Sequence, residues 1–329
     1  MIMRGILLVL LMAVVGAARA GPAEAPLALE AKIPLGDIAG RLDHLAVDLK
    51  RKRLYVAELG NNTLGVVDLA AGKVTQTLAG FFREPQGVAY EPVSDTVYVA
   101  NGGDGSVQVL RGGDLTGLVR IEVGDDPDNI RIDPRRHRVM VGYGNGALVV
   151  IDTAKHAKIS DIALNGHPEG FQIDDDGNRL FVNVPRRGEI VALDLATGVQ
   201  KELPTGGMRS NFPLAIDPDA HRVLTVFRNP PLLMALASAD GKVVAKLDTC
   251  GDADDVFVDR RRHRIYVICG AGAIDVIEPE GDGYRRLAQL STGPSARTAL
   301  FVPELDRLYV AAANSGSSPA AIWVFRPAP

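Results

Sequence analysis

The chain has 329 residues, a formal net charge of −4 and only 5% aromatic residues, among them a single tryptophan. A mildly acidic total argues against a dedicated nucleic-acid-binding protein, because such domains are usually basic overall. The 35 glycines and 20 prolines favour a chain with many tight turns.

The first 20 residues have the pattern of a secretory signal peptide. Arg4 lies in a short charged region, residues 6–15 are almost wholly apolar, and residues 18–20 read Ala-Arg-Ala, an A-x-A cleavage site. The apolar run is shorter than the roughly 20 residues that span a bilayer. We therefore expect cleavage after Ala20 and a periplasmic or secreted protein of residues 21–329, without a transmembrane segment.

Residues 29–35 form the first expected strand. Apolar residues from Leu29 to Leu35 alternate with Glu30, Lys32 and Pro34. This period of two is typical of a strand with one exposed face, as at the outer edge of a sheet.

Residues 43–80 contain a unit of four short strands. We expect these strands at residues 45–47, 54–57, 64–69 and 74–78, separated by polar or glycine-containing turns. Four antiparallel strands joined by tight turns are typical of one propeller blade.

The same unit recurs along the whole chain. One large apolar position returns every 41 to 43 residues, at Tyr55, Tyr98, Met140, Phe181, Leu224, Tyr266 and Tyr309. A repeat of about 40 residues built from short strands indicates a β-propeller. The sequence therefore predicts an all-β fold, a seven-bladed β-propeller that forms one domain over residues 21–329.

The two ends of the chain predict how the ring closes. Residues 321–325 resemble a third strand, after which no fourth strand follows, whereas residues 29–35 resemble a fourth strand. We expect the N-terminal strand to complete the last blade, because this pairing removes an exposed sheet edge.

Three of the six histidines occupy one repeated turn position. His137, His221 and His263 each follow an Asp-containing turn between the first two strands of a blade. We interpret them as turn residues, not as a ligand set.

The loops that lead into the innermost strands are expected to form the rim of one channel mouth. They differ from blade to blade although the strands repeat, and variable polar loops on a rigid scaffold are the natural binding surface. The predicted ligand-binding rim consists of Asp43, His44, Gln86, Asp128, Asn129, Glu169, Asp254, Asp255 and Arg297.

This rim is acidic, which suggests a divalent cation as cofactor. Convergent carboxylates suit a hard cation such as Ca²⁺, and Asp128, Glu169 and Asp254 are the candidate ligands. The alternative is a solvated acidic mouth in which Arg297 pairs with Asp43 or Asp254. Neither the loop with Asp128 nor the loop with Asp254 has the 12-residue spacing of an EF-hand Ca²⁺-binding loop.

His44 is the candidate for acid–base catalysis at the mouth, because histidine titrates near neutrality. The alternative is a hydrogen-bonded loop histidine. The chain has no G-x-S-x-G, H-E-x-x-H or C-x-x-C-H motif, which removes three common classes of catalytic or haem site.

The opposite face carries runs of basic residues at the turns between first and second strands. These residues are Lys50–Arg53, Arg135, Arg136, Arg138, Arg260–Arg262 and Arg264. A charge run is usually a solvated face, and the alternative is a docking surface for an anionic partner.

Cys250 and Cys269 are the only cysteines, and export would place them in an oxidising compartment. Cys250 precedes the first strand of the sixth blade and Cys269 ends the second. Antiparallel neighbours bring these two positions to the same end of the blade, so we predict a disulfide.

The repeats resemble the YVTN-type, YncE-like family of secreted bacterial β-propellers. The best match to the family motif is Tyr98-Val99-Ala100-Asn101, and residues 60–63, 101–105, 181–185 and 301–305 are also similar. The resemblance covers about residues 40–325. It implies an exported seven-bladed propeller and supplies no catalytic residues. WD40 and quinoprotein propellers fit less well, because recurring tryptophans are absent.

These observations favour a non-catalytic binding or scaffold protein whose acidic rim binds a small molecule or a protein. The alternative is a metal-dependent hydrolase or lyase at the same rim, by analogy with lactonase-type propellers, although those resemble six-bladed rings. A third interpretation is an accessory protein beside an electron-transfer enzyme.

Overall fold

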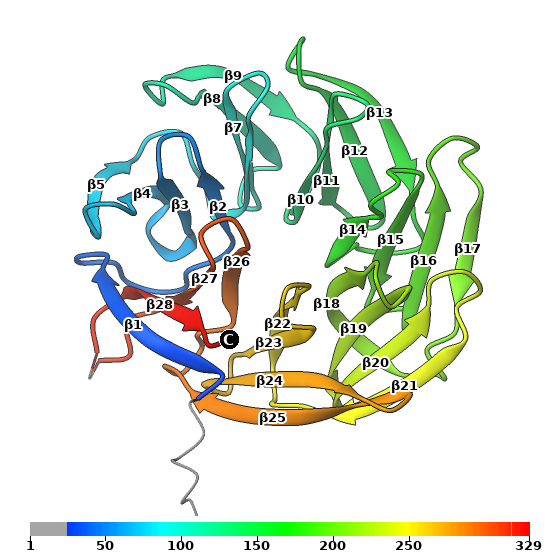
Figure 1. Cartoon of the computed structure of the whole chain (residues 1–329). Coiled ribbons are helices and arrows are strands. Elements are labelled where there is room, and N and C mark those ends of the chain that lie inside the picture. Colours follow the sequence, from blue (N-terminus) through cyan, green and yellow to red (C-terminus); the bar gives the residue numbers. More distant parts are fainter. Residues whose placement is uncertain (1–24, 317) are drawn as a thin grey trace, which may run out of the picture.

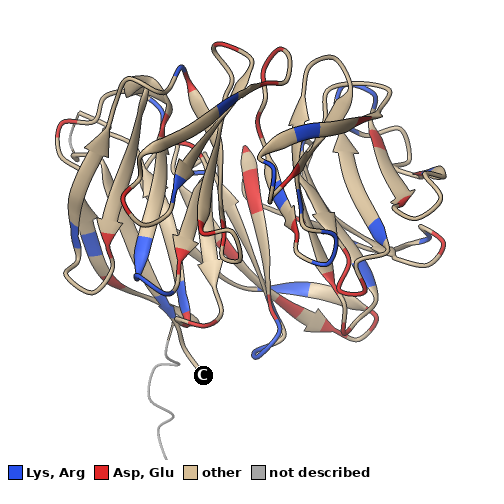
Figure 2. Ribbon diagram, turned by 90° about the horizontal axis from the view of Figure 1, so that it is seen from above, with Lys and Arg blue, Asp and Glu red and all other residues tan. Residues whose placement is uncertain are grey.

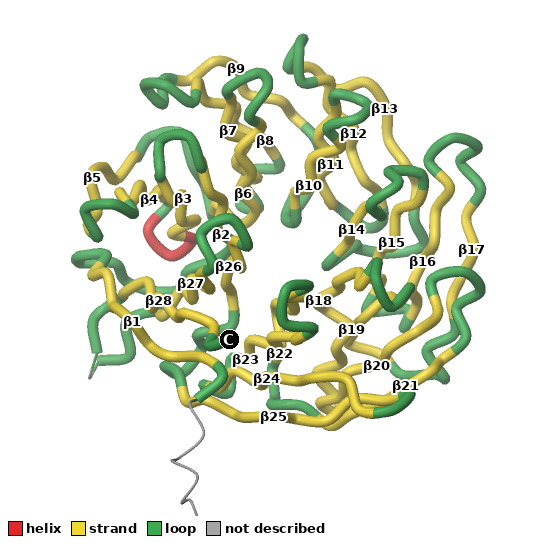
Figure 3. The backbone as a smooth tube through the Cα atoms, viewed as in Figure 1, coloured by secondary structure: helices red, strands yellow, loops and turns green. Residues whose placement is uncertain are grey.

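The computed structural model describes residues 25–316 and 318–329 and contains seven four-stranded antiparallel sheets arranged in a ring (Figure 1). The predicted signal peptide, residues 1–20, lies outside the described residues. Strands and turns account for nearly all of the described chain, and one short 3-10 helix, Leu59–Asn61, interrupts the first blade (Figure 3). The all-β, seven-bladed prediction is therefore confirmed.

The first four blades follow one another along the chain. Blade 1 contains β2 (Leu45–Asp48), β3 (Arg53–Glu58), β4 (Thr63–Asp68) and β5 (Lys73–Leu78). Blade 2 contains β6 (Pro85–Glu91), β7 (Thr96–Asn101), β8 (Ser106–Arg111) and β9 (Gly117–Glu122). Blade 3 contains β10 (Ile130–Asp133), β11 (Arg138–Tyr143), β12 (Ala147–Asp152) and β13 (Ala157–Ala163). Blade 4 contains β14 (Phe171–Ile173), β15 (Arg179–Val184), β16 (Glu189–Asp194) and β17 (Gln200–Leu203).

The last three blades complete the ring. Blade 5 contains β18 (Arg209–Asp217), β19 (Arg222–Asn229), β20 (Pro231–Ala237) and β21 (Val243–Asp248). Blade 6 contains β22 (Ala253–Asp259), β23 (Arg264–Cys269), β24 (Ala273–Glu280) and β25 (Gly283–Ser291). Blade 7 contains β26 (Thr298–Val302), β27 (Arg307–Ala312), β28 (Ala321–Pro327) and, from the N-terminus, β1 (Leu27–Pro34).

The N-terminal strand closes the ring as predicted. β1 pairs antiparallel with β28 from Leu27 opposite Pro327 to Pro34 opposite Ala321. Its register shifts between Leu29 and Ala31, and a similar shift occurs between the third and fourth strands of blades 1, 2, 3, 5 and 6. β1 therefore has the pairing irregularity of a fourth strand, although it comes first in the sequence.

The repeated apolar position forms the packing between blades. Tyr55, Tyr98, Met140, Phe181, Leu224 and Tyr266 have no exposed surface, and Tyr309 is 4% exposed. All lie in the second strand of their blades. Because this strand is covered by a neighbouring blade on each face, a large apolar side chain is required there in every repeat.

The turn histidines occupy a position that is defined by its backbone conformation and not by the chemistry of the side chain. His137, His221 and His263 have φ values of 53°, 53° and 52°, and Lys52 and Asp306 have 53° and 52° at the same turn. The position needs a left-handed conformation, which Asn, Asp and His adopt more readily than most residues. This explains why histidine recurs there.

Arginines of the basic turns bind aspartates of their own and neighbouring turns, which reduces the unpaired positive charge of this face. Arg51 bridges Asp48 in its own blade and Asp95 in the next, and Arg262 does the same with Asp259 and Asp306. Figure 2 shows acidic and basic residues together at both ends of the ring. An anionic partner on this face stays a prediction.

Replacing Arg262 by Ala should lower the free energy of unfolding by about 2 kcal/mol, because it leaves the buried Asp259 carboxylate without its charged partner. The Arg262 side chain is only 10% exposed. The matched control is Arg261→Ala, whose side chain is 69% exposed and lies 3.8 Å from the same Asp306. The control should change stability by less than about 0.5 kcal/mol in urea unfolding. Equal effects of the two variants would contradict the bridging role.

The structure joins Cys250 and Cys269 in a disulfide, with their Cα atoms 5.9 Å apart. Both residues are buried. The bond connects the segment before β22 to the end of β23, beside the start of β22 that carries Asp254.

Candidate functional site

The predicted rim residues gather at one mouth of the central channel. A cavity of about 370 Å³ opens there, and eight of the nine predicted residues line it: Asp43, His44, Gln86, Asp128, Asn129, Glu169, Asp254 and Arg297. The ninth, Asp255, lines the adjoining channel cavity of about 290 Å³, which His44 also borders. The second cavity is lined by both apolar side chains, such as Val47 and Phe257, and charged ones, such as Arg131.

Three arginines at this mouth were not predicted. Arg41, Arg186 and Arg228 line the cavity beside Arg297. Arg228 comes from β19, a second strand that extends to the rim, whereas the prediction considered only residues before the innermost strands. The mouth therefore contains alternating charges and is less acidic than the sequence suggests.

Asp254 is held in an ion-pair network. Its carboxylate contacts the guanidinium groups of Arg228 and Arg297, and the Arg297 contact measures 3.1 Å. Arg228 also lies over the Phe212 ring, 3.5 Å from its centre. The predicted alternative in which Arg297 pairs with Asp254 is thus observed, and both Asp254 oxygens already have cationic partners.

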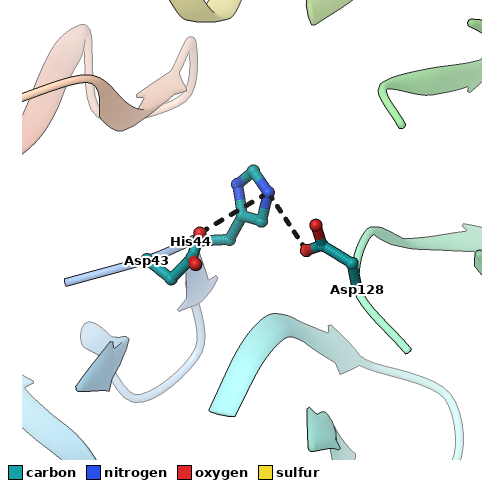
Figure 4. A group of neighbouring side chains, drawn as sticks. All are labelled: Asp43, His44 and Asp128. Carbon is teal, nitrogen blue, oxygen red and sulfur yellow. Dashed lines mark ion pairs between the residues drawn. The ribbon is translucent and has the colours of Figure 1, made fainter. Parts of the chain in front are cut away.

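Asp43, His44 and Asp128 converge in the channel from blades 1 and 3 (Figure 4). His44 Nε2 lies 3.9 Å from Asp43 Oδ1 and 3.7 Å from Asp128 Oδ1. Asp43 is 1% exposed and Asp128 is 8% exposed. Among the described residues, neither of these two carboxylate oxygens has a hydrogen-bond partner.

The backbone of the trio is fixed by hydrogen bonds to the next strand. Asp43 N donates to Ala57 O at 2.8 Å, Ala57 N donates to His44 O at 3.1 Å, and Asp128 N donates to Gly142 O at 2.9 Å. A Cβ atom at Gly87 would lie 2.0 Å from Asp128 O. Glycine at position 87 therefore allows blade 2 to pack directly against the loop that carries Asp128.

Burial shifts the titration of the acids around His44. Removal from water, together with neighbouring carboxylates, raises the pKa of Asp128 to about 7, and burial also raises the pKa of Asp255 to about 7. Burial raises the pKa of Asp43, and it raises that of Glu169 well above its usual value. Burial alone would lower the pKa of His44, but the carboxylates of Asp255, Asp43 and Asp128 outweigh it and raise the pKa.

Asp255 approaches the other side of the imidazole. Its Oδ2 lies 3.9 Å from His44 Nδ1 and accepts a 2.7 Å hydrogen bond from the Ala299 N–H. His44 therefore lies among carboxylates from three blades. The carboxylates of Asp43, Asp128 and Asp255 around His44 can each bind a proton, or they can together bind a cation.

Comparisons with known proteins give the fold and no family. No protein-family model matches the chain, and no curated protein matches it.

None of the helices in the described residues is long and apolar enough to cross a membrane.

Two solved structures illustrate the similarity. One chain of the Kuenenia stuttgartiensis hydrazine synthase matches with a TM-score of 0.74 and 19% identity over 95% of this chain and 99% of that chain. A chain from a crystal structure of a mitotic checkpoint complex matches with a TM-score of 0.76 and 16% identity, over 96% of this chain and 98% of that chain. At these identities the comparisons support the seven-bladed β-propeller fold alone.

Proposed function

We propose that this protein is an exported, YVTN-type propeller that binds a small cationic ligand at the channel mouth formed by Asp43, His44 and Asp128. One observation carries the proposal. Two buried carboxylate oxygens from different blades face the same histidine without hydrogen-bond partners. Buried polar atoms are nearly always paired in folded proteins, so an unpaired pair of acids aimed into a cavity favours an absent ligand.

The other large cavities lack this property. A groove of about 440 Å³ lies between β1 and the turn at residues 69–72, and it is also lined by Arg307. Glu30 and Arg307 form an ion pair with each other in this groove. The groove therefore gives a ligand fewer unpaired charges than the channel mouth does.

The proposed export rests on the sequence of residues 1–20 and on the Cys250–Cys269 disulfide. Disulfides persist in oxidising compartments and are rare in reducing ones. The two observations together support the proposal of a periplasmic or secreted location. Fusion of residues 1–24 to a reporter that is active only after export would test this point, and a cytoplasmic reporter would contradict it.

A metal-dependent hydrolase or lyase at the same mouth is the second candidate. It is favoured by Asp128 and Asp255, whose pKa values of about 7 suit proton transfer at neutral pH. Turnover of a panel of lactones and esters that disappears in Asp128→Asn would support this activity. Binding without turnover would leave the protein a binding protein.

A thermal-shift screen of chloride salts of divalent metals and of small organic amines tests the proposed function. A ligand at about 100 times its Kd stabilises the native state by about 2.7 kcal/mol, which should raise Tm by about 5 °C for a protein of this size. The double variant Asp43→Asn/Asp128→Asn should lose the shift. The control Asp114→Asn, at an exposed outer turn, should keep it. An unchanged shift in the double variant would contradict the proposed location.

A further inference from the structure

We infer that Asp43, His44 and Asp128 form a three-ligand site for a divalent transition metal such as Zn²⁺ or Mn²⁺. This inference rests on the proposed function, because it names the cation held at the mouth. It differs from the Ca²⁺ site predicted from sequence in both its residues and its metal. The cluster supplies one imidazole nitrogen and two carboxylate oxygens, all within 4.8 Å of one another.

The separations suit a shared ion better than a hydrogen bond. His44 Nε2 lies 3.9 Å from Asp43 Oδ1 and 3.7 Å from Asp128 Oδ1, and both distances exceed those of real hydrogen bonds. Two ligand atoms that are each about 2.1 Å from one ion, at angles of 90° or more, lie about 3.0–4.2 Å apart. Both His–Asp separations fall in that range, and all three ligand atoms lie within 4.8 Å of one another, so rotation of the side chains would bring them onto one ion.

Two further polar atoms of the trio, Asp43 Oδ2 and His44 Nδ1, face charged neighbours. Arg41 donates to Asp43 Oδ2 at 2.6 Å, which leaves Oδ1 as the free oxygen aimed at the imidazole. On the other side of the ring, Asp255 faces His44 Nδ1 and is itself held by the Ala299 N–H. A carboxylate behind a histidine ligand is the usual arrangement that fixes the ring of a metal-bound imidazole. Asp255 lies 3.9 Å from His44 Nδ1, beyond hydrogen-bond distance, so it would take this positioning role after the same small ring rotation that admits the ion.

The residue types decide which metal is favoured. Ca²⁺ and Mg²⁺ select oxygen ligands, whereas imidazole nitrogen suits Zn²⁺ and other first-row transition metals. Of the three ligands predicted from sequence, only Asp128 belongs to the trio. Asp254 is occupied by Arg228 and Arg297, which leaves it no free oxygen for an ion.

Three protein ligands leave coordination positions open toward the cavity of about 370 Å³. Structural zinc sites normally use four protein ligands, and sites with three keep a position for water or a bound molecule. The proposed metal would therefore be accessible to an exogenous ligand entering from the mouth.

Equilibrium dialysis of the full mature chain, stripped with chelator and then exposed to Zn²⁺, Mn²⁺ or Ca²⁺, tests the inference. We expect one equivalent of Zn²⁺ or Mn²⁺ to bind at least 10-fold more tightly than Ca²⁺. His44→Gln should weaken Zn²⁺ and Mn²⁺ binding by 10-fold or more, and the control His263→Asn, at an exposed turn, should bind within 2-fold of the wild type. Circular dichroism of each variant checks that it folds.

The outcomes separate the inference from the proposed function. If Asp43→Asn and Asp128→Asn abolish binding but His44→Gln does not, or if Ca²⁺ binds as tightly, the cation site stands and the transition-metal assignment is wrong. If none of the three metals binds at one equivalent, the assignment is also wrong, while an organic amine that still stabilises the protein would leave the proposed function intact. Should His44→Gln not fold, pulsed electron paramagnetic resonance of the Mn²⁺-loaded wild type decides: ¹⁴N coupling from a bound imidazole supports the inference, and its absence overturns it.

Discussion

A chain that lacks residues 27–34 should aggregate at micromolar concentration, whereas the chain that begins at Ala25 should remain soluble. Deleting β1 exposes the whole edge of β28, and an unpaired edge strand is a template for pairing with other molecules. The deletion also removes Leu27 and Ile33, which are 1% and 5% exposed. Leu27 packs in the core between blades 6 and 7, and Ile33 packs in the core between blades 7 and 1. Light scattering during refolding measures the expected difference.

A pair of point variants tests closure without deletion. Ile33→Asp places a charge in the core between blades 7 and 1 and should lower the free energy of unfolding by several kcal/mol, roughly 3 or more. Leu29→Asp lies on the same strand at 45% exposure and should cost less than about 1 kcal/mol. A soluble deletion mutant as stable as the chain that begins at Ala25 would contradict closure by β1.

Removing the disulfide should cost about 3 kcal/mol of unfolding free energy, because the bond restricts the unfolded chain over a sequence separation of 19 residues. The variant Cys250→Ala/Cys269→Ala, measured by urea unfolding, reports this loss. The wild type in reductant should show the same loss, whereas reductant should not change the double variant. Thiol titration of the denatured, unreduced wild type should find no free thiol, and two free thiols would contradict the bond.

The fold was predictable because one physical demand recurs in every blade. The second strand is covered on both faces, so Tyr55, Tyr98 and their counterparts must be large and apolar. This requirement explains why the large apolar position returns at a regular spacing, and that spacing predicted the number of blades. The predicted strand limits were also close to those of the structure. Turns that contain a residue in the left-handed conformation recur beside the strands, as at His137 and His263.

The candidate site was predictable only in part, for a geometric reason. The repeat shows which residues precede each innermost strand, and that placed Asp43 and Asp128 at one mouth. It does not show how side chains from blades 1 and 3 meet across the channel, which depends on the closed ring. Arg228 was missed because it extends to the mouth from a second strand, and its pairing with Asp254 changed the expected set of ligands.

Anomalous diffraction from crystals of residues 21–329 grown with Mn²⁺ or Zn²⁺ tests the metal site most directly. We expect one anomalous peak in the channel mouth within about 2.3 Å of Asp43 Oδ1, His44 Nε2 and Asp128 Oδ1. An ordered mouth with no peak at a saturating metal concentration, or a peak only at other residues, would contradict it.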